Sequence, residues 1–102
     1  MTHKKKYAVF GNPIAHSFSP QIYKKLFSNN NFPASYTRIL TDTPQKIIHF
    51  INVFNLSGAN ITFPFKQSII PLLDSIADDA KEIQSVNTIV NQNGKLLGFN
   101  TD

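Results

Sequence analysis

The sequence contains no cysteine among its 102 residues. This absence excludes disulfide scaffolds, zinc sites with cysteine ligands and thiol catalysis. It also fits a reducing compartment, and we expect a cytoplasmic protein. The three histidines, His3, His16 and His49, lack the spacing of metal ligands, so we expect no bound metal.

Long apolar runs are also missing. None approaches the roughly 20 residues that a membrane helix needs, so we expect no membrane partner. Residues 1–6 are basic and residues 7–10 are apolar, which resembles the start of an export signal. Because the apolar part is shorter than the roughly 7–15 residues of a signal core, we interpret residues 1–6 as a solvated leader before a first strand.

Acidic residues are few. The chain has ten Lys and Arg residues and six Asp and Glu residues. The resulting net charge of +4 is compatible with binding to nucleic acid or to phosphate-bearing small molecules. The most basic stretch, residues 4–6, lies at the terminus without a nucleic-acid motif, so we expect no nucleic-acid partner. Hydrophobic residues make up 41% of the chain, which excludes global disorder and suits one domain over residues 1–102.

The first half of the chain alternates strand and helix signals. Residues 6–10 are β-prone and end at Gly11, which predicts a first strand. Ser19 and Pro20 supply an N-cap and a proline at the first helical position, which predicts a helix after them. Residues 34–40 predict a second strand.

The next helix signal is Thr43 followed by Pro44. An apolar stripe predicts that this helix runs to about residue 56 and is stopped by Gly58. Residues 59–63 predict a third strand. Residues 66–84 predict helical turns interrupted at a proline, which cannot donate a hydrogen bond within a helix.

The end of the chain predicts a hairpin, because Asn93 and Gly94 separate two β-prone runs at residues 86–91 and 95–99. The full order is β-α-β-α-β-α-β-β, and strands separated by helices favour parallel pairing. We therefore expect an α/β fold: a three-layer, mainly parallel mixed sheet with helices on both faces and a C-terminal β-hairpin.

Polar residues follow the first predicted strand. Ser17 and Ser19 lie between a strand end and a helix N-terminus, where backbone N–H groups and the helix dipole favour an anion. Two hydroxyls there can complete a site for a carboxylate. Taken alone, however, the stretch favours a simple helix cap at Ser19 with Ser17 in solvent.

A second polar stretch, residues 58–66, interrupts a strand that should be buried. Asn60 and Thr62 share a strand face by the two-residue period, and Lys66 follows the carboxyl end, where open α/β sheets place ligands. A surface lysine, with Asn60 bonded to nearby backbone, explains the same residues equally well.

Two shorter stretches, residues 85–88 and 98–102, add the amide of Asn87 and the carboxylate of Asp102. Neither G-x-G-x-x-G nor G-x-x-x-x-G-K-[ST] occurs in the chain, so a dinucleotide has no phosphate-binding loop here. Taken singly, each of these two stretches favours a turn or a cap. If the lysine and the aspartate converge beside hydroxyls and amides, the set can bind a polyhydroxylated carboxylic acid and move a proton on one of its hydroxyls.

Together, the four stretches resemble the N-terminal, substrate-binding domain of the shikimate dehydrogenase family. The matching motifs are Y-A-V-F-G-N-P-I-A-H-S-F-S-P at 7–20, G-A-N-I-T-F-P-F-K at 58–66, S-V-N-T at 85–88 and G-x-N-T-D at 98–102. Each motif is weak alone. Four in the family's order, covering essentially the whole chain, are highly specific.

The resemblance implies a reversible, NADP-dependent interconversion of shikimate and 3-dehydroshikimate in aromatic amino-acid biosynthesis. It implies that Lys66 is the acid/base, with Asp102 as its partner. It also implies that Ser17 and Ser19 hold the substrate carboxylate, and that Asp78 approaches the cofactor. The residues implied to contact the ring hydroxyls are Thr62, Lys66, Asn87 and Asp102.

Family members continue after G-x-N-T-D into a Rossmann domain with a glycine-rich loop that binds NADP, and this sequence does not. We therefore predict a substrate-binding half that binds its substrate weakly and does not turn over alone. Two alternatives stay open: the same half of a quinate/shikimate dehydrogenase, or a stand-alone ligand-binding module.

Overall fold

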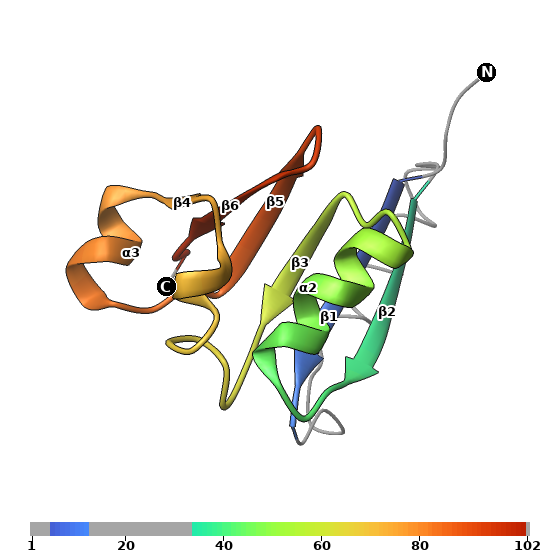
Figure 1. Cartoon of the computed structure of the whole chain (residues 1–102), viewed down its shortest axis with the longest axis horizontal. Helices are drawn as coiled ribbons and strands as arrows, with labels where there is room; N and C mark the ends of the chain where they lie inside the picture. Colours follow the sequence, from blue (N-terminus) through green and yellow to red (C-terminus); the bar gives the residue numbers. More distant parts are fainter. Residues whose placement is uncertain (1–4, 13–33, 102) are drawn as a thin grey trace.

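The computed structural model describes residues 5–12 and 34–101. Its strands form one six-stranded sheet, with helix α2 lying across one face (Figure 1). In chain order the elements are β1 (Lys5–Gly11), β2 (Ala34–Leu40), α2 (Pro44–Val53), β3 (Gly58–Ile61), the 3₁₀ helix η1 (Ile70–Leu72), β4 (Ser75–Ile76), α3 (Asp78–Ile83), β5 (Thr88–Gln92) and β6 (Lys95–Phe99). No helix in this described part is long and apolar enough to cross a membrane.

The sheet order is β2-β1-β3-β5-β6-β4. Strand β1 pairs in parallel with both β2 and β3, whereas β3 and β5 are antiparallel and β5 and β6 form the hairpin. Strand β4 adds a short parallel pair at the far edge. The expected mixed α/β sheet is confirmed. The helix predicted after Pro20 lies outside the described residues.

The two faces of the sheet differ in chemistry because alternate residues of a strand point to opposite sides. On the α2 side, Ala8 and Phe10 of β1 and Ala59 of β3 join Ile47 and Ile51 of the helix in one buried cluster. Those two helix residues are four apart, so they lie on one face of α2. The opposite side of the sheet carries more polar residues.

Helix α2 begins as the sequence predicts. The Thr43 hydroxyl accepts from the Lys46 N–H at 3.3 Å, and Pro44 occupies the first turn. One turn of backbone also brings the Lys46 ammonium within 2.8 Å of the Asp42 carboxylate. That hydrogen bond lowers the pKa of Asp42, although the pair is exposed and contributes little to stability.

The predicted end of α2 was wrong. Helix α2 stops at Val53, and Gly58 begins β3 instead of ending the helix. The helix is closed by Asn55, which takes the left-handed conformation with φ at 51°, while the Leu56 N–H donates to the Ile51 carbonyl at 2.9 Å. Asparagine tolerates this conformation better than most residues and replaces the glycine that usually closes such a motif.

Residues 66–84 also differ from the prediction of interrupted helical turns. Only the three-residue η1, which contains Pro71, and α3 are helical, with β4 between them. The reason is the open edge of β6. The Asp74 N–H donates to the Leu96 carbonyl at 2.9 Å, and the Asp74 carboxylate accepts from the Leu96 N–H at 2.7 Å.

The hairpin prediction is confirmed. Asn93 and Gly94 have φ values of 54° and 93°, as a two-residue turn of this handedness requires. Further along β6, Gly98 is buried for a different reason. A Cβ there would lie 2.7 Å from a methyl group of Leu73 and 3.0 Å from methyl groups of Ile76 and Val86.

We predict that Gly98→Ala destabilises the fold by about 1–3 kcal/mol, the usual range for overpacking a filled core. The end of the Leu73 side chain can move aside, but the β-branched side chains of Ile76 and Val86 have few alternative rotamers and resist even a small shift. Urea unfolding followed by circular dichroism measures the change, with Gln92→Ala at an exposed strand end as the control. An unchanged midpoint for Gly98→Ala would contradict the prediction.

Candidate functional site

Three segments that are distant in sequence meet beyond the end of β3. The Ile61 N–H donates to the Asn87 carbonyl at 2.8 Å, and the Val86 N–H donates to the Lys66 carbonyl at 2.8 Å. The Asn87 N–H in turn donates to the Phe99 carbonyl at 3.0 Å. These bonds join the segment after β3, the entry to β5 and the end of β6, and thereby bring together three of the four sequence motifs.

The segment after β3 presents Thr62 and Lys66. The Thr62 N–H continues the pairing with β1 by donating to the Phe10 carbonyl at 2.9 Å, and a turn follows in which the Phe65 N–H donates to the Thr62 carbonyl at 3.1 Å. The peptide bond before Pro64 is cis. Phe65 is 4% exposed and belongs to the core, so it anchors the loop that carries the half-buried Lys66.

Thr62 and Lys66 share an open cavity of about 420 Å³. The remaining lining residues are Phe63, Pro64, Gln67 and Ser85. The volume falls within the roughly 300–1,000 Å³ typical of ligand sites. An ammonium donor beside two hydroxyls can bind and protonate the oxygen of a small polar molecule, while Phe63 supplies an apolar wall.

The amide of Asn87 lies at the junction of these segments and is only 9% exposed. Its Oδ1 accepts from the Thr88 hydroxyl at 2.9 Å, from the Thr101 N–H at 3.0 Å and from the Thr101 hydroxyl at 3.3 Å. The neighbouring Asn100 donates from Nδ2 to the Ser85 carbonyl at 3.0 Å. Buried amides therefore hold the end of the G-x-N-T-D motif against S-V-N-T.

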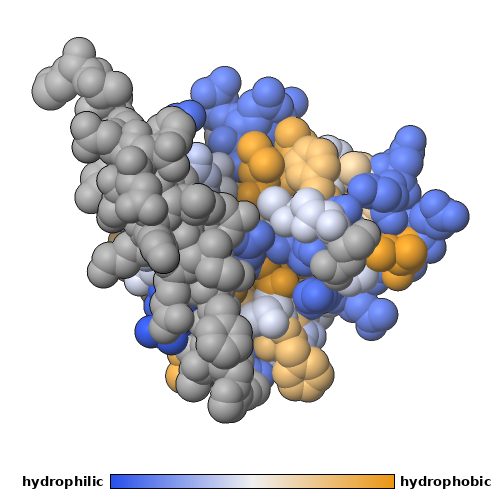
Figure 2. Space-filling view, turned by 180° about the vertical axis from the view of Figure 1, so that it is seen from behind, coloured by the Kyte–Doolittle hydropathy of each residue, from blue (hydrophilic) through white to orange (hydrophobic). Residues whose placement is uncertain are grey.

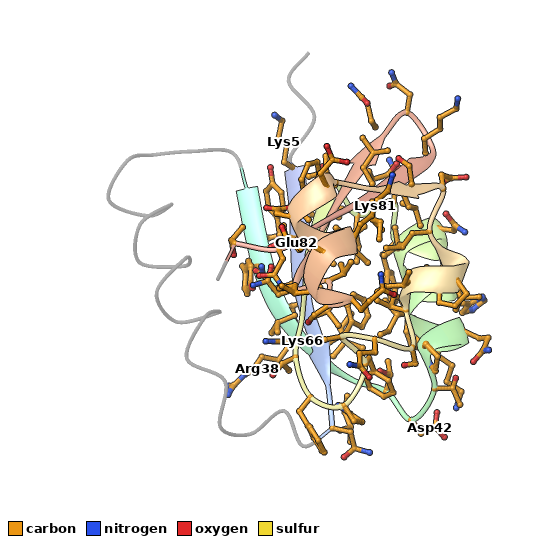
Figure 3. The ribbon with its side chains drawn as sticks, turned by 90° about the vertical axis from the view of Figure 1, so that its left-hand side faces the viewer. Lys5, Arg38, Asp42, Lys66, Lys81 and Glu82 are labelled. Carbon is orange, nitrogen blue, oxygen red and sulfur yellow. The ribbon has the colours of Figure 1, made fainter. Side chains whose placement is uncertain are left out.

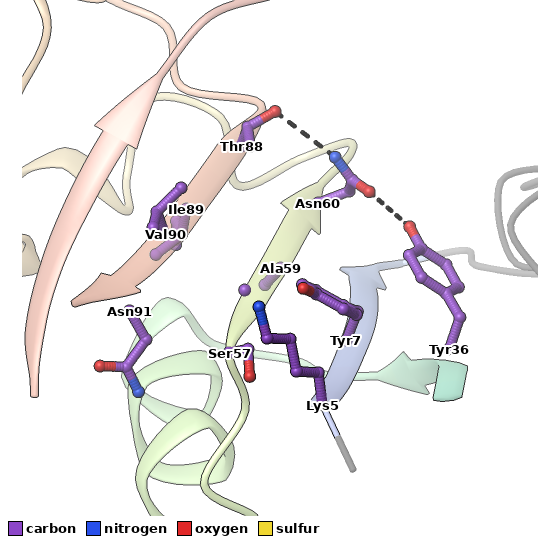
Figure 4. A pocket seen from close by; sticks show the side chains of 11 residues that line it. Lys5, Tyr7, Tyr36, Ser57, Ala59, Asn60, Thr88, Ile89, Val90 and Asn91 are labelled. Atoms are coloured by element: carbon purple, nitrogen blue, oxygen red, sulfur yellow. Dashed lines mark hydrogen bonds between the residues drawn. The ribbon is translucent and has the colours of Figure 1, made fainter. Parts of the chain in front are cut away.

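Asn60 and Tyr36 extend this polar network across the sheet (Figure 4). The Tyr36 hydroxyl donates to Asn60 Oδ1, and Asn60 Nδ2 donates to the Asn87 carbonyl and the Thr88 hydroxyl, both at 3.4 Å. Asn60 is thus bonded in part to backbone, as one of the two sequence interpretations holds. It lines a different cavity from Thr62, one of about 540 Å³ that also borders Tyr36.

Tyr36 was missed by the sequence analysis. It occupies an ordinary alternating position on the edge strand β2, and only the register of the sheet brings it toward Asn60. Thr88 and Thr101 were within the motifs but were given no role. Their hydroxyls matter through a shared partner, Asn87, which local sequence does not reveal.

The side of the sheet opposite α2 carries positively charged side chains, two of them near the site. In Figure 3, Lys66 and Arg38 both extend to that side, away from α2, and Lys5 lies at its other end. The described part of this face also shows hydrophobic residues among hydrophilic ones (Figure 2), and Val90 is 41% exposed.

Only some of the predicted site residues lie at the junction beyond β3. Thr62, Lys66 and Asn87 lie in segments joined by backbone hydrogen bonds, whereas Asp78 is an exposed residue in the first turn of α3. Ser17, Ser19 and Asp102 lie outside the described residues. The pairing of Lys66 with Asp102 therefore stays a prediction. Among the residues that the structure describes, no group of three or more His, Asp or Glu side chains could hold a metal ion.

Comparison with known proteins gives consistent matches. A family model described as "Shikimate dehydrogenase substrate binding domain" matches residues 9–89. The shikimate dehydrogenase (NADP(+)) of Geobacillus sp. (strain WCH70) is 41% identical over 97% of this chain. The chain spans 36% of the length of that relative.

Two crystal structures of shikimate dehydrogenases have the same fold. The enzyme from Aquifex aeolicus is 38% identical over 96% of this chain, which covers 38% of that protein, with a TM-score of 0.89. The enzyme from Thermus thermophilus, in complex with NADP(H) and shikimate, is 31% identical over 95% of this chain and 38% of its own, with a TM-score of 0.86. Because the family model covers most of the sequence, this chain belongs to the shikimate dehydrogenase substrate-binding domain family.

Proposed function

We propose that this chain is the substrate-binding domain of an NADP-dependent shikimate dehydrogenase. Such an enzyme interconverts shikimate and 3-dehydroshikimate in aromatic amino-acid biosynthesis, the route through chorismate. The observation that carries the proposal is the junction beyond β3, where hydrogen bonds of the backbone and of the Asn87 side chain join the segments of Lys66, Asn87 and Thr101. Membership of the family supports shikimate as the ligand.

The chemistry assigns each residue a task. Reduction of the ring carbonyl places negative charge on its oxygen, which needs a proton donor within reach, and we assign that donor to Lys66 with Asp102 as its partner. Thr62 and Asn87, with the same lysine and aspartate, would contact ring hydroxyls. The residues assigned to the substrate carboxylate are Ser17 and Ser19. Hydrogen bonds to charged groups contribute about 1.5–3 kcal/mol each, so a few of them anchor the substrate.

The hydride carrier has no phosphate-binding glycine loop among these 102 residues. We therefore propose that NADP(H), which supplies or accepts the hydride when bound, is held mainly by residues of a Rossmann domain outside this sequence. Asp78 is the one residue of this chain that we assign to the cofactor side. A chain without cysteine is compatible with the reducing environment of the cytoplasm, and we propose that the protein is cytoplasmic.

The first prediction from the proposed function concerns binding. Shikimate added to the isotope-labelled chain should shift the NMR signals of Thr62, Lys66 and Asn87. Thr62→Val should raise the dissociation constant about 2- to 10-fold, the change expected when one neutral hydrogen bond is lost. Thr37→Val, at an exposed position of β2, is the matched control and should leave the constant unchanged. Shifts confined to other regions, or a stronger response to quinate, would argue against the assignment.

The second prediction is that the chain alone does not turn over. Purified protein mixed with NADPH and 3-dehydroshikimate should show no sustained loss of absorbance at the nicotinamide band. The reason is that no phosphate loop holds the hydride donor against the substrate. Sustained turnover by the isolated chain would show that cofactor binding does not require residues outside it.

The third prediction concerns Lys66 in a complete enzyme. A chimera in which this chain replaces the matching part of the Geobacillus enzyme provides the missing residues. There Lys66→Ala should lower kcat roughly 10²–10⁴-fold, the usual scale for lost acid–base catalysis. Lys95→Ala, at an exposed position on the hairpin, is the matched control. Near-normal kcat in the Lys66 variant would remove this residue from the acid–base role.

A further inference from the structure

Tyr36 lies two strands away from the polar network that it joins. Strand β1 separates β2 from β3, so the Tyr36 side chain must cross about 10 Å, two strand spacings, to reach Asn60. The register allows this crossing. Tyr36 is opposite Tyr7 on β1, and Tyr7 is opposite Gly58 on β3, whose missing side chain leaves room for the Tyr7 ring beside it. Both Tyr36 and Asn60 line the same cavity (Figure 4).

The hydrogen bonds of Asn60 fix the orientation of its amide. Oδ1 accepts from the Tyr36 hydroxyl, while Nδ2 donates to the Asn87 carbonyl and to the Thr88 hydroxyl. If the amide were flipped, its oxygen would face the Asn87 carbonyl, and two acceptors would oppose each other. In this orientation the Tyr36 hydroxyl donates to Oδ1, and Asn60 donates in turn toward β5.

The donors then run in one direction toward the substrate-facing segment. The Thr88 hydroxyl accepts from Asn60, which leaves its own hydrogen for Asn87 Oδ1 at 2.9 Å. Hydrogen bonds in such a chain polarise one another. The order is Tyr36, Asn60, Thr88 and Asn87, and the last of these also holds Thr101.

We propose that Tyr36 is a positioning residue for substrate binding. It acts through Asn60 and Thr88 on the carboxamide of Asn87, and it does not itself touch the substrate. The inference rests on the proposed function, in which Asn87 is a substrate ligand. It adds a residue of the edge strand β2, outside the four motifs, to the set that determines affinity.

The first test needs no ligand. Side-chain amide signals of Asn60 and Asn87 are recorded by NMR in the free chain, in Tyr36→Phe and in Tyr7→Phe. Tyr7→Phe is the matched control, because it removes a hydroxyl from the neighbouring ring that lines the same cavity. The Tyr36 variant should move both amide signals, and the control should leave both near their original positions. Signals of Asn87 that do not respond to Tyr36→Phe would overturn the proposal.

The second test measures shikimate affinity together with the urea midpoint. Tyr36→Phe should raise the dissociation constant about 2- to 10-fold, as expected for one lost neutral hydrogen bond, with the Tyr7→Phe control unchanged. A purely structural role would instead lower the unfolding midpoint and leave the affinity of the folded protein unaltered, which would overturn the proposal.

A double-mutant cycle tests the route of action. In an Asn60→Ala background, Tyr36→Phe should have no further effect on affinity, because the carboxamide through which it acts on Asn87 is gone. Additive effects would mean that Tyr36 does not act through Asn60. If Asn60→Ala does not fold, Thr88→Val breaks the same chain with a side chain of similar shape and should reduce the effect of Tyr36→Phe. Failure of the original chain to bind shikimate would count against the proposed function, whereas the ligand-free signals test the positioning role separately.

Discussion

Strand β3 is the constraint on which the site depends, because the sheet changes there from parallel to antiparallel pairing. It runs parallel to β1 on one side and antiparallel to β5 on the other. The carboxyl end of β3 is therefore beside the carboxyl end of β1, the amino end of β5 and the carboxyl end of β6. The segments that leave β1, β3 and β6 and the segment that enters β5 therefore lie at one end of the sheet, where ligands bind in open α/β folds.

The free-energy cost of burying polar groups at this end of the sheet is offset by their many hydrogen bonds. Asn87 is nearly inaccessible, and its side-chain oxygen receives three donors from two residues. A buried amide without partners is costly, whereas a satisfied network specifies one arrangement. The same packing explains why the last motif has a glycine at position 98, since methyl groups from three side chains occupy the space of a Cβ.

Sequence reasoning worked where a local interaction decides the structure. The Thr43 cap with Pro44, the Asn93-Gly94 turn and the strand at Ala34–Leu40 were all predicted within their observed bounds. The predictions were wrong where backbone pairing with a distant strand, or an unrecognised helix-closing residue, decides the structure. The segment around Asp74 is tied to the edge of β6 instead of continuing as helix, and α2 is closed by Asn55 instead of Gly58.

The sequence by itself determined the family, the α/β class and the residues with suitable chemistry, since short motifs and local periodicity carry that information. Tertiary structure alone decided that Lys66, Asn87 and Thr101 belong to one junction and that Tyr36 reaches it from the edge strand. The physical reason is that strand order and register set which side chains meet. Both result from long-range backbone pairing, in which residues 24 positions apart, Tyr36 and Asn60, become hydrogen-bond partners.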